Sequence, residues 1–428
     1  MAYNREETSR LAQEMPPQEI TATQEETFTG GLGLVAIAPV RNSLLLEHTA
    51  EAREQDTWQA LRQPALAGLN CRVLQATSDE APGLLAYVEP HLGAPHSPDR
   101  FHVQHALSKA VSVPLATKQR AAAKAVPKAE ETRKQAHAYL AMATNAPVQR
   151  GPGRPPQGVT NLEQGKDALE GARAAHQRLS AQREQVTQCL RAMGHAYHFV
   201  ALERGVRRNG KLIAGDIHAQ LQTIRTIAQQ ADLSQACLKR LEKAARVIPK
   251  MQATIEFVSG YVRQQVSQLA LSPPASYAMH AHLMPSSYLE RVAATRTRTA
   301  GAPRRALAER LRPPRFASGG ALGALSPMAP QQLTHKAPTL AEVFQRSSSN
   351  VEGRNGYLSL RHHQLRGRDH PRKRACLTAV HNFFLTRPDG TTAVERFFGQ
   401  KPRSMFGAML GAVEIPPAPL SPPRRALG

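Results

Sequence analysis

The sequence has few cysteines and no long apolar segment. Its four cysteines are scattered through 428 residues without a C-x-x-C pair, which argues against a disulfide framework or a zinc ribbon and fits a reducing compartment. No apolar run approaches the ~20 residues of a membrane-spanning helix. The opening segment, MAYNREETSRLAQEM, lacks the apolar core of a signal peptide. We therefore expect a cytoplasmic protein with no membrane partner.

Acidic residues are in the minority. The formal net charge is +22 and the isoelectric point is about 10.5. Residues 291–428 alone carry 23 Lys/Arg against 7 Asp/Glu. Such a concentration of positive charge predicts a polyanionic partner, nucleic acid before membrane. The apolar fraction of 41% is slightly below average, which favours one well-packed core with looser segments around it.

The first quarter of the chain predicts a small sheet. Residues 1–17 are polar, and we expect a disordered lead-in there. Residues 18–114 predict the order βββαβα, which opens a ribonuclease-H-like fold; in such sheets ligands gather at the carboxyl ends of the strands. The expected strands are 19–28, 33–40, 43–48 and 71–77, and the expected helices are 52–67, which Pro64 breaks near its end, and 82–92.

The remaining chain predicts helices and a second part of the same core. Apolar stripes at helical spacing are typical of a helical-bundle core. The predicted fold class is α/β plus α, a ribonuclease-H-like mixed sheet interrupted by a large α-helical insertion. The expected segments are an α-helical insertion at 115–295, interrupted at Pro127, a low-complexity linker at 296–338, the C-terminal part of the core with the Glu352 helix at 339–412, and a Pro-rich tail at 413–428. Within the linker, ALAERL is one possible short helix.

Three acids are candidate metal ligands. Glu25 lies on the first strand, Asp79 follows the fourth, and Glu352 lies in SSSNVEGRNGYLSLRHHQLRG. On a helix, Glu352 and Asn355 share one face. By charge patterning alone Glu352 is a solvated, salt-bridging residue; together with partner carboxylates it becomes a ligand. Three such carboxylates would suit two Mg²⁺ or Mn²⁺ ions about 3.5–4 Å apart.

Two blocks of sequence resemble known transposases. SDEAPGLLAYVEPHLGAPHSPDRFHVQH resembles the block around the second catalytic acid of Mutator-like and related bacterial insertion-sequence transposases. SSSNVEGRNGYLSLRHHQLRG, followed by LTAVHNFFLTRPDGTTAVERFFGQKP, resembles the closing Glu block of a bacterial DDE transposase family with a largely uncharacterised C-terminal domain. The resemblance covers both ends of the chain well and the middle loosely.

The resemblance implies a DNA transposase. Such an enzyme cuts DNA strands with water and joins the freed 3′-hydroxyl to target DNA, and it would be associated with the nucleoid when bound. Glu25, Asp79 and Glu352 would be the catalytic residues and would hold Mg²⁺ or Mn²⁺. The implied partners are the DNA of the element ends and of the target, with a homo-oligomer in the transposition complex.

The chain departs from the family at the first acid. The family has an Asp followed by E-T-F, whereas this chain has Glu25-Glu26-Thr27-Phe28. The extra methylene of Glu25 moves the carboxylate by about 1 Å, against a tolerance of roughly 0.5 Å for catalytic groups. The short lead-in also leaves little room for an upstream helix-turn-helix. An active enzyme, a truncated or inactive copy, and a non-catalytic basic DNA-binding protein therefore remain alternatives.

Basic residues around and after Glu352 are candidate DNA contacts. The run RGRDHPRKR has the composition of a phosphate-contacting surface, although an ordinary solvated loop has the same composition. The candidates are Arg354, Arg361, His363, Arg366, Arg368, Arg372, Lys373 and Arg374.

Two further motifs have both a functional and an ordinary interpretation. Arg154 lies in GPGRPP, which resembles an AT-hook whose Arg enters the narrow minor groove; a Pro/Gly linker is the plainer alternative. A cluster of histidines has the spacing of a zinc site, with a polar rim beside the catalytic site as the alternative. Its members are His91, His96, Asp99, His102 and His105.

Overall fold

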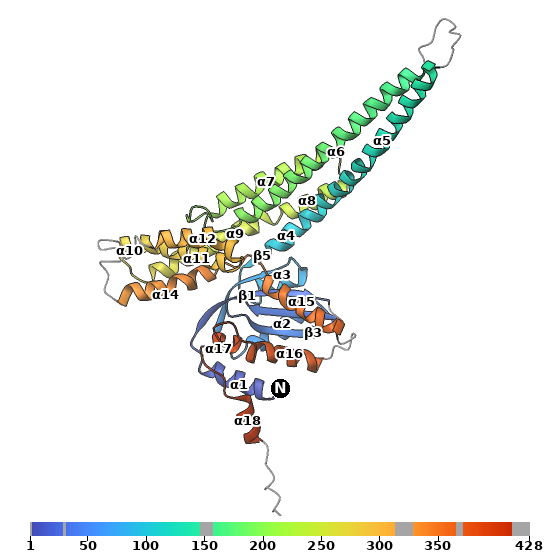
Figure 1. Cartoon of the computed structure of the whole chain (residues 1–428). Coiled ribbons are helices and arrows are strands. Elements are labelled where there is room, and N and C mark those ends of the chain that lie inside the picture. Colours follow the sequence, from blue (N-terminus) through green and yellow to red (C-terminus); the bar gives the residue numbers. More distant parts are fainter. Residues whose placement is uncertain (1, 29–30, 146–156, 313–327, 365–370, 413–428) are drawn as a thin grey trace, which may run out of the picture. The chain divides into compact units, whose positions relative to one another are not determined.

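The computed structural model describes residues 2–28, 31–145, 157–312, 328–364 and 371–412. The chain forms two compact units, which Figure 1 shows. We call Met1–His96 with Ser347–Gly428 the sheet unit, and Ser97–Arg346 the helical unit. The chain is therefore a mixed α/β protein with a helical insertion. That insertion begins earlier and ends later than the expected 115–295.

The sheet has five strands in the order β3-β2-β1-β4-β5. β1 pairs antiparallel with β2, β2 pairs antiparallel with β3, and β1 pairs parallel with β4. The four predicted strands agree with β1 to β4 to within a few residues. The strands are β1 (Gln18–Thr27), β2 (Leu32–Ala38), β3 (Ser43–Ala50), β4 (Cys71–Ser78) and β5 (His96–Pro98).

Side chains alternate across the sheet and build a separate core on each face. Leu34 packs on one face with Trp58 from α2 and with residues of α3. Val35 packs on the other face with Val351 from α15. The helices of the sheet unit are α1 (Ala2–Gln13), α2 (Gln55–Leu66), α3 (Pro82–Val88), α15 (Ser349–Gln364), α16 (Pro371–Phe383), α17 (Ala393–Phe398) and α18 (Met405–Ala412).

The N-terminal segment is a helix, contrary to the expected disordered lead-in at residues 1–17. Leu11 and Met15 are buried in one cluster with Phe397 and Phe398 from α17. These long-range contacts stabilise α1. The expectation was wrong because α1 has few apolar residues of its own, and local periodicity does not register a partner that lies almost four hundred residues away.

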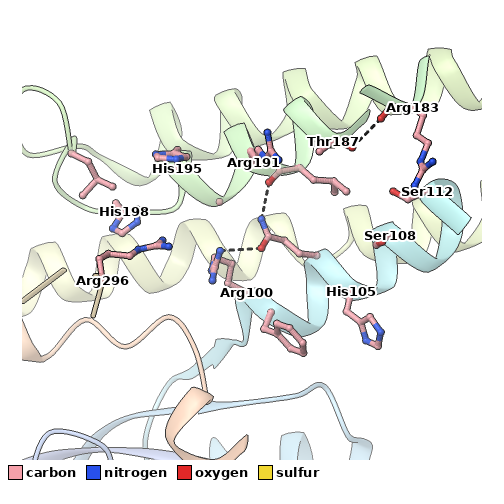
Figure 2. A pocket seen from close by; sticks show the side chains of 15 residues that line it. Arg100, His105, Ser108, Ser112, Arg183, Thr187, Arg191, His195, His198 and Arg296 are labelled. Carbon is pink, nitrogen blue, oxygen red and sulfur yellow. Dashed lines mark hydrogen bonds between the residues drawn. The ribbon is translucent and has the colours of Figure 1, made fainter. Parts of the chain in front are cut away.

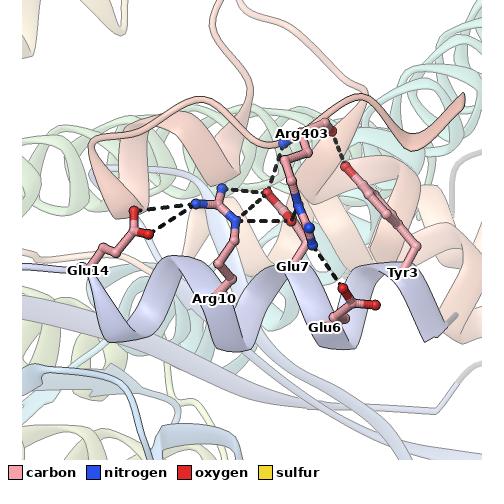
Figure 3. A network of polar contacts seen from close by, with 6 residues as sticks. All are labelled: Tyr3, Glu6, Glu7, Arg10, Glu14 and Arg403. Carbon is pink, nitrogen blue, oxygen red and sulfur yellow. Dashed lines mark hydrogen bonds and ion pairs between the residues drawn. The ribbon is translucent and has the colours of Figure 1, made fainter. Parts of the chain in front are cut away.

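An ion-pair network also joins α1 to Arg403, which precedes α18 (Figure 3). The Glu7 carboxylate, fully covered, accepts hydrogen bonds from Arg10 Nη2 at 2.6 Å and from Arg403 Nε at 2.6 Å. The backbone N–H of Arg403 donates to Glu7 at 2.8 Å. The network therefore joins α1 to the segment around Arg403 within the sheet unit.

The two prolines that were expected to interrupt helices lie inside them instead. Pro64 lies inside α2, and Pro127 lies inside α5 without interrupting it. In Figure 1, α5 and α6 run side by side as a long helical hairpin. The helical unit contains α4 (Arg100–Leu107), the π-helix η1 (Ser108–Ser112), α5 (Val113–Asn145), α6 (Gln157–Ala196), α7 (Gly210–Gln230), α8 (Gln235–Ala245), α9 (Ile248–Ser267), α10 (Pro273–Ala278), the π-helix η2 (Met279–Leu283), α11 (Met284–Ala294), α12 (Arg298–Leu311) and α14 (Met328–Glu342).

The expected linker at 296–338 contains two helices, α12 and α14. Leu307 of α12 is buried, and α12 packs on α11. Gly301 permits this close approach, because a Cβ there would lie 2.7 Å from the carbonyl oxygen of Ala293. The composition obscured most of α12 because Gly301 and Pro303 weaken an isolated helix, whereas in the fold α12 is stabilised by packing on α11. None of the described helices is long and apolar enough to cross a membrane.

Candidate metal-binding site

Glu25 lies near the carboxyl end of the central strand β1. It pairs with Val35 of β2, so its side chain lies on the sheet face that α15 covers. The residue is 5% exposed. The sheet therefore holds a carboxylate under α15, where a neutral side chain would be the usual choice.

Glu352 approaches Glu25 from the first turn of α15. A carboxylate oxygen of Glu352 lies within 4.8 Å of one of Glu25. The amino-terminal end of a helix carries partial positive charge, which favours a carboxylate in the first turn. The structure thus brings together two of the three predicted acids, which lie at opposite ends of the sequence.

Polar side chains of α15 and its lead-in orient the Glu25 carboxylate. Ser348 donates a hydrogen bond from its Oγ to one Glu25 oxygen. Asn355 donates from Nδ2 to the other oxygen at 3.2 Å. The Oδ1 atom of Asn355 is buried and has no hydrogen-bond partner among the residues that the structure describes. This oxygen is therefore a further candidate metal ligand next to the Glu25 carboxylate.

This set of groups fits a hard divalent cation. Two carboxylates at this separation repel each other, and a cation between them would offset both charges. Carboxylate and amide oxygens are the ligands that Mg²⁺ and Mn²⁺ prefer. The unsatisfied Asn355 oxygen supports the same fit, because buried polar atoms normally have partners. Glu25, Glu352 and Asn355 are therefore the candidate ligands in the sheet unit.

Asp79, the third predicted acid, follows β4 directly, and β4 runs parallel to β1. Burial raises the pKa of Glu26, and the charge of Asp79 adds to this effect. Within the described parts of the chain, the ligand atoms grouped around Glu25 and Glu352 do not include Asp79. A site shared by all three acids therefore stays a prediction.

The helical unit has a second pair of metal-compatible groups. Asp99 caps α4 by accepting a hydrogen bond from a backbone N–H at 2.6 Å, and its other oxygen lies 3.9 Å from His102 Nε2. Both side chains offer ligand atoms suited to a metal ion. The other histidines of the predicted zinc cluster make separate contacts: His91 stacks on Tyr87, His96 contacts Ser78 Oγ, and His105 stacks on Phe101.

Two of the predicted DNA-binding arginines are buried. Arg354 is 5% exposed and makes two hydrogen bonds to the Glu47 carboxylate, at 2.7 and 3.1 Å. Arg374 is 3% exposed. The prediction is corrected for these two residues: their guanidinium groups are covered and so are not available to a phosphate backbone. Charge runs in the sequence do not distinguish a buried ion pair from a solvated face.

The other predicted contacts that the structure describes are exposed: Arg361, His363, Arg372 and Lys373. Three of them line a cavity of about 440 Å³ between the end of α15 and the start of α16, together with Cys376 and Leu377. The three basic side chains border this cavity mainly with their apolar stems, and their exposed charges suit an anionic partner. The remaining candidates, Arg154, Arg366 and Arg368, lie outside the described residues.

Sequence reasoning missed several groups around the acids. Ser348 has an ordinary sequence context. Helical spacing placed Asn355 on the face of Glu352, but its contact with Glu25 was not predicted. The effect of Asp79 on Glu26 depends on how β1 and β4 pair. The burial of Glu47 with Arg354 depends on how α15 packs on the sheet. These contacts join residues that are far apart in the sequence, so no local sequence pattern predicts them.

Comparison with known proteins gives one match. A model of a family of unknown function (DUF6399) matches residues 279–425. The match covers less than half of the chain and includes α15 with Glu352. No curated protein and no solved structure matches the chain significantly.

Proposed function

We propose that the protein is a divalent-metal-dependent DNA transposase of the DDE type. The observation that carries this proposal is the convergence of Glu25 and Glu352, within 4.8 Å, at the carboxyl end of the central strand. Metal-dependent nucleotidyl transfer needs carboxylates in this kind of arrangement. Arg361, Arg372 and Lys373 provide exposed positive charge in the same unit.

The topology supports a ribonuclease-H-like identity for the sheet unit. The strand order β3-β2-β1-β4-β5, with β1 and β4 parallel, is the order of that fold. In this topology the three catalytic acids belong to the first strand, the end of the fourth strand and a later helix. Glu25, Asp79 and Glu352 occupy these positions along the chain.

The roles of the chain's own residues follow from their contacts. Glu25 and Glu352 would hold the ion, and Ser348 and Asn355 would fix the orientation of the Glu25 carboxylate. Asp79 would complete the site from the end of β4. A bound Mg²⁺ or Mn²⁺ would supply activation of the attacking oxygen and stabilisation of the leaving oxygen in phosphodiester cleavage.

A strand-transfer assay with Mg²⁺ tests the proposal. The substrate is a duplex that carries the ends of the DNA flanking the coding sequence, with a supercoiled plasmid as the target. We expect strand transfer by the wild type, loss of it in Glu352→Gln and Asp79→Ala, and equal or higher activity in Glu25→Asp. Activity that persists in Glu352→Gln would contradict the assignment of the site.

A non-catalytic DNA-binding protein is the second candidate. The position of Asp79 favours this second candidate. The charge of Asp79 raises the pKa of Glu26, and its carboxylate is not among the described ligand atoms grouped around Glu25 and Glu352. If wild type and Glu25→Asp are both inactive while DNA binding persists, this second candidate replaces the first.

A further inference from the structure

The helical unit contains a basic cavity that the proposed catalytic site does not use. Its volume is about 620 Å³, within the range of roughly 300–1,000 Å³ that is usual for ligand pockets. Figure 2 shows Arg183, Arg191 and His195 coming from α6 and Arg100 coming from α4. Arg296 contributes a fourth arginine. None of the described residues that line the cavity is acidic.

Arg100 is oriented by hydrogen bonds, but one of its N–H donors has no hydrogen-bond partner among the described residues. Arg100 donates from Nη1 to Gln104 Oε1 at 2.9 Å, and Gln104 in turn donates to the Leu190 carbonyl at 2.7 Å. The Nε atom of Arg100 is buried and has no hydrogen-bond partner among the described residues. A guanidinium has five N–H donors, so this one retains donors for a ligand.

Positive charges gather here with little compensation. Burial lowers the pKa of Arg100, Asp99 opposes this effect, and the cation of Arg296 adds to it. Burial also lowers the pKa of Arg346 to about 10, and both Arg100 and Arg296 contribute to that shift. Cations that repel one another in a partly buried site would be stabilised by an anion.

An aromatic pair lies beside these cations. Phe101 lines the cavity and is 43% exposed. Its ring stacks on that of His105, with centroids 5.8 Å apart and planes inclined by 23°. Exposed aromatic faces next to cations are the groups that bind single-stranded nucleic acid, because the bases stack on the rings while the cations contact the backbone.

We propose that this cavity binds one nucleotide unit of a single DNA strand. Arg100, Arg191 and Arg296 hold the phosphate, and Phe101 provides a face for the base. That the phosphate belongs to DNA rests on the proposed function. Anion binding by the arginines does not depend on it.

The test measures the affinity of the full-length protein for a 5′-labelled dT12 oligonucleotide by fluorescence anisotropy at several salt concentrations. EDTA is present throughout, so that a failure of the metal-site proposal does not affect the result. The variants are Arg191→Ala and Arg296→Ala, both at exposed positions. Arg240→Ala is the matched control, since Arg240 is exposed on α8 of the same unit and lies outside the cavity.

Each cavity variant is expected to weaken dT12 binding about tenfold, as for a lost hydrogen bond between charged groups. Each should also reduce the slope of log K against log salt by about 0.7, the value for one phosphate of a single strand. Arg240→Ala should change neither quantity. Equal effects of Arg191→Ala and Arg240→Ala would overturn the proposal.

Phe101→Ala separates a nucleotide from a bare phosphate group. We expect this variant to lose at least about fivefold in dT12 affinity, as for one base stacked on an aromatic ring. Its affinity for inorganic pyrophosphate, measured by competition, should stay at the wild-type value. Unchanged dT12 affinity in Phe101→Ala would overturn the assignment of a nucleotide.

Discussion

The Glu7 network allows one prediction to be worked out in detail. Hydrogen bonds from Arg10 lower the pKa of Glu7 to about 2, burial opposes the shift, and hydrogen bonds from Arg403 add to it. The ordinary value is 4.5, so the difference is about 2.5 pKa units, equivalent to about 3 kcal/mol. The arginine partners are partly exposed, at 28% and 49%, so solvent screening reduces this to about 2 kcal/mol.

The sign of the pH dependence follows from the lowered pKa. A carboxyl group whose pKa is lower in the folded state stabilises the fold above its ordinary pKa, and this contribution is lost as the pH falls through the folded value. Glu7 therefore stabilises the sheet unit above about pH 4.5. Its contribution disappears progressively as the pH falls toward 2.

Urea unfolding of Glu7→Gln, followed by circular dichroism, measures this contribution. We expect the variant to lose about 2 kcal/mol at pH 7 and to approach the wild type as the pH falls below 4.5. Glu14→Gln is the control, since Glu14 pairs with Arg10 at 3.3 Å and is 51% exposed. Its loss should be under about 0.5 kcal/mol. Equal losses in the two variants would refute the reasoning.

Two further substitutions test buried charges in the sheet unit. Arg354→Ala leaves the Glu47 carboxylate, which is 0% exposed, without its cation, so urea unfolding should show a loss of about 3–5 kcal/mol in stability. The control Arg361→Ala, at an exposed position, should stay within about 0.5 kcal/mol of the wild type. Similar losses in the two variants would contradict the buried ion pair. Burial raises the pKa of Glu26, and the charge of Asp79 adds to this effect. A carboxyl group whose pKa is raised in the folded state destabilises the fold at pH values above its ordinary pKa. Glu26→Gln should therefore have a higher melting temperature than the wild type at pH 8, and the difference should disappear near pH 4. A lower melting temperature at pH 8 would contradict that assignment.

The strands were predictable because they have strong local signals. Alternation and turn residues placed β1 to β4 to within a few residues. Of α12, only the end, ALAERL, had a helical signal, because Gly301 lies in its first half. Helices made of small residues are stabilised by close packing, and α1 is stabilised by Arg403 and by the core around Leu11. These are contacts over long sequence separations, and no local pattern encodes them.

The candidate site was predictable in its acids and less so in its surroundings. Glu25 and Glu352 were identified from strand position and sequence resemblance. The burial of Arg354 and Arg374 was missed because the run of cations around them has the same composition whether it faces solvent or a carboxylate such as Glu47. A local charge pattern gives the number of charged residues, but it does not predict which residues they pair with in the fold.

Calorimetric titration with Mn²⁺ tests the central claim most directly. The account predicts that the wild type binds Mn²⁺ and that Glu25→Gln and Glu352→Gln each weaken binding by at least about tenfold, as expected for the loss of a ligand. Glu89→Gln, at an exposed position of the same unit, should bind as the wild type does. Wild-type affinity in both Glu25→Gln and Glu352→Gln would contradict the account.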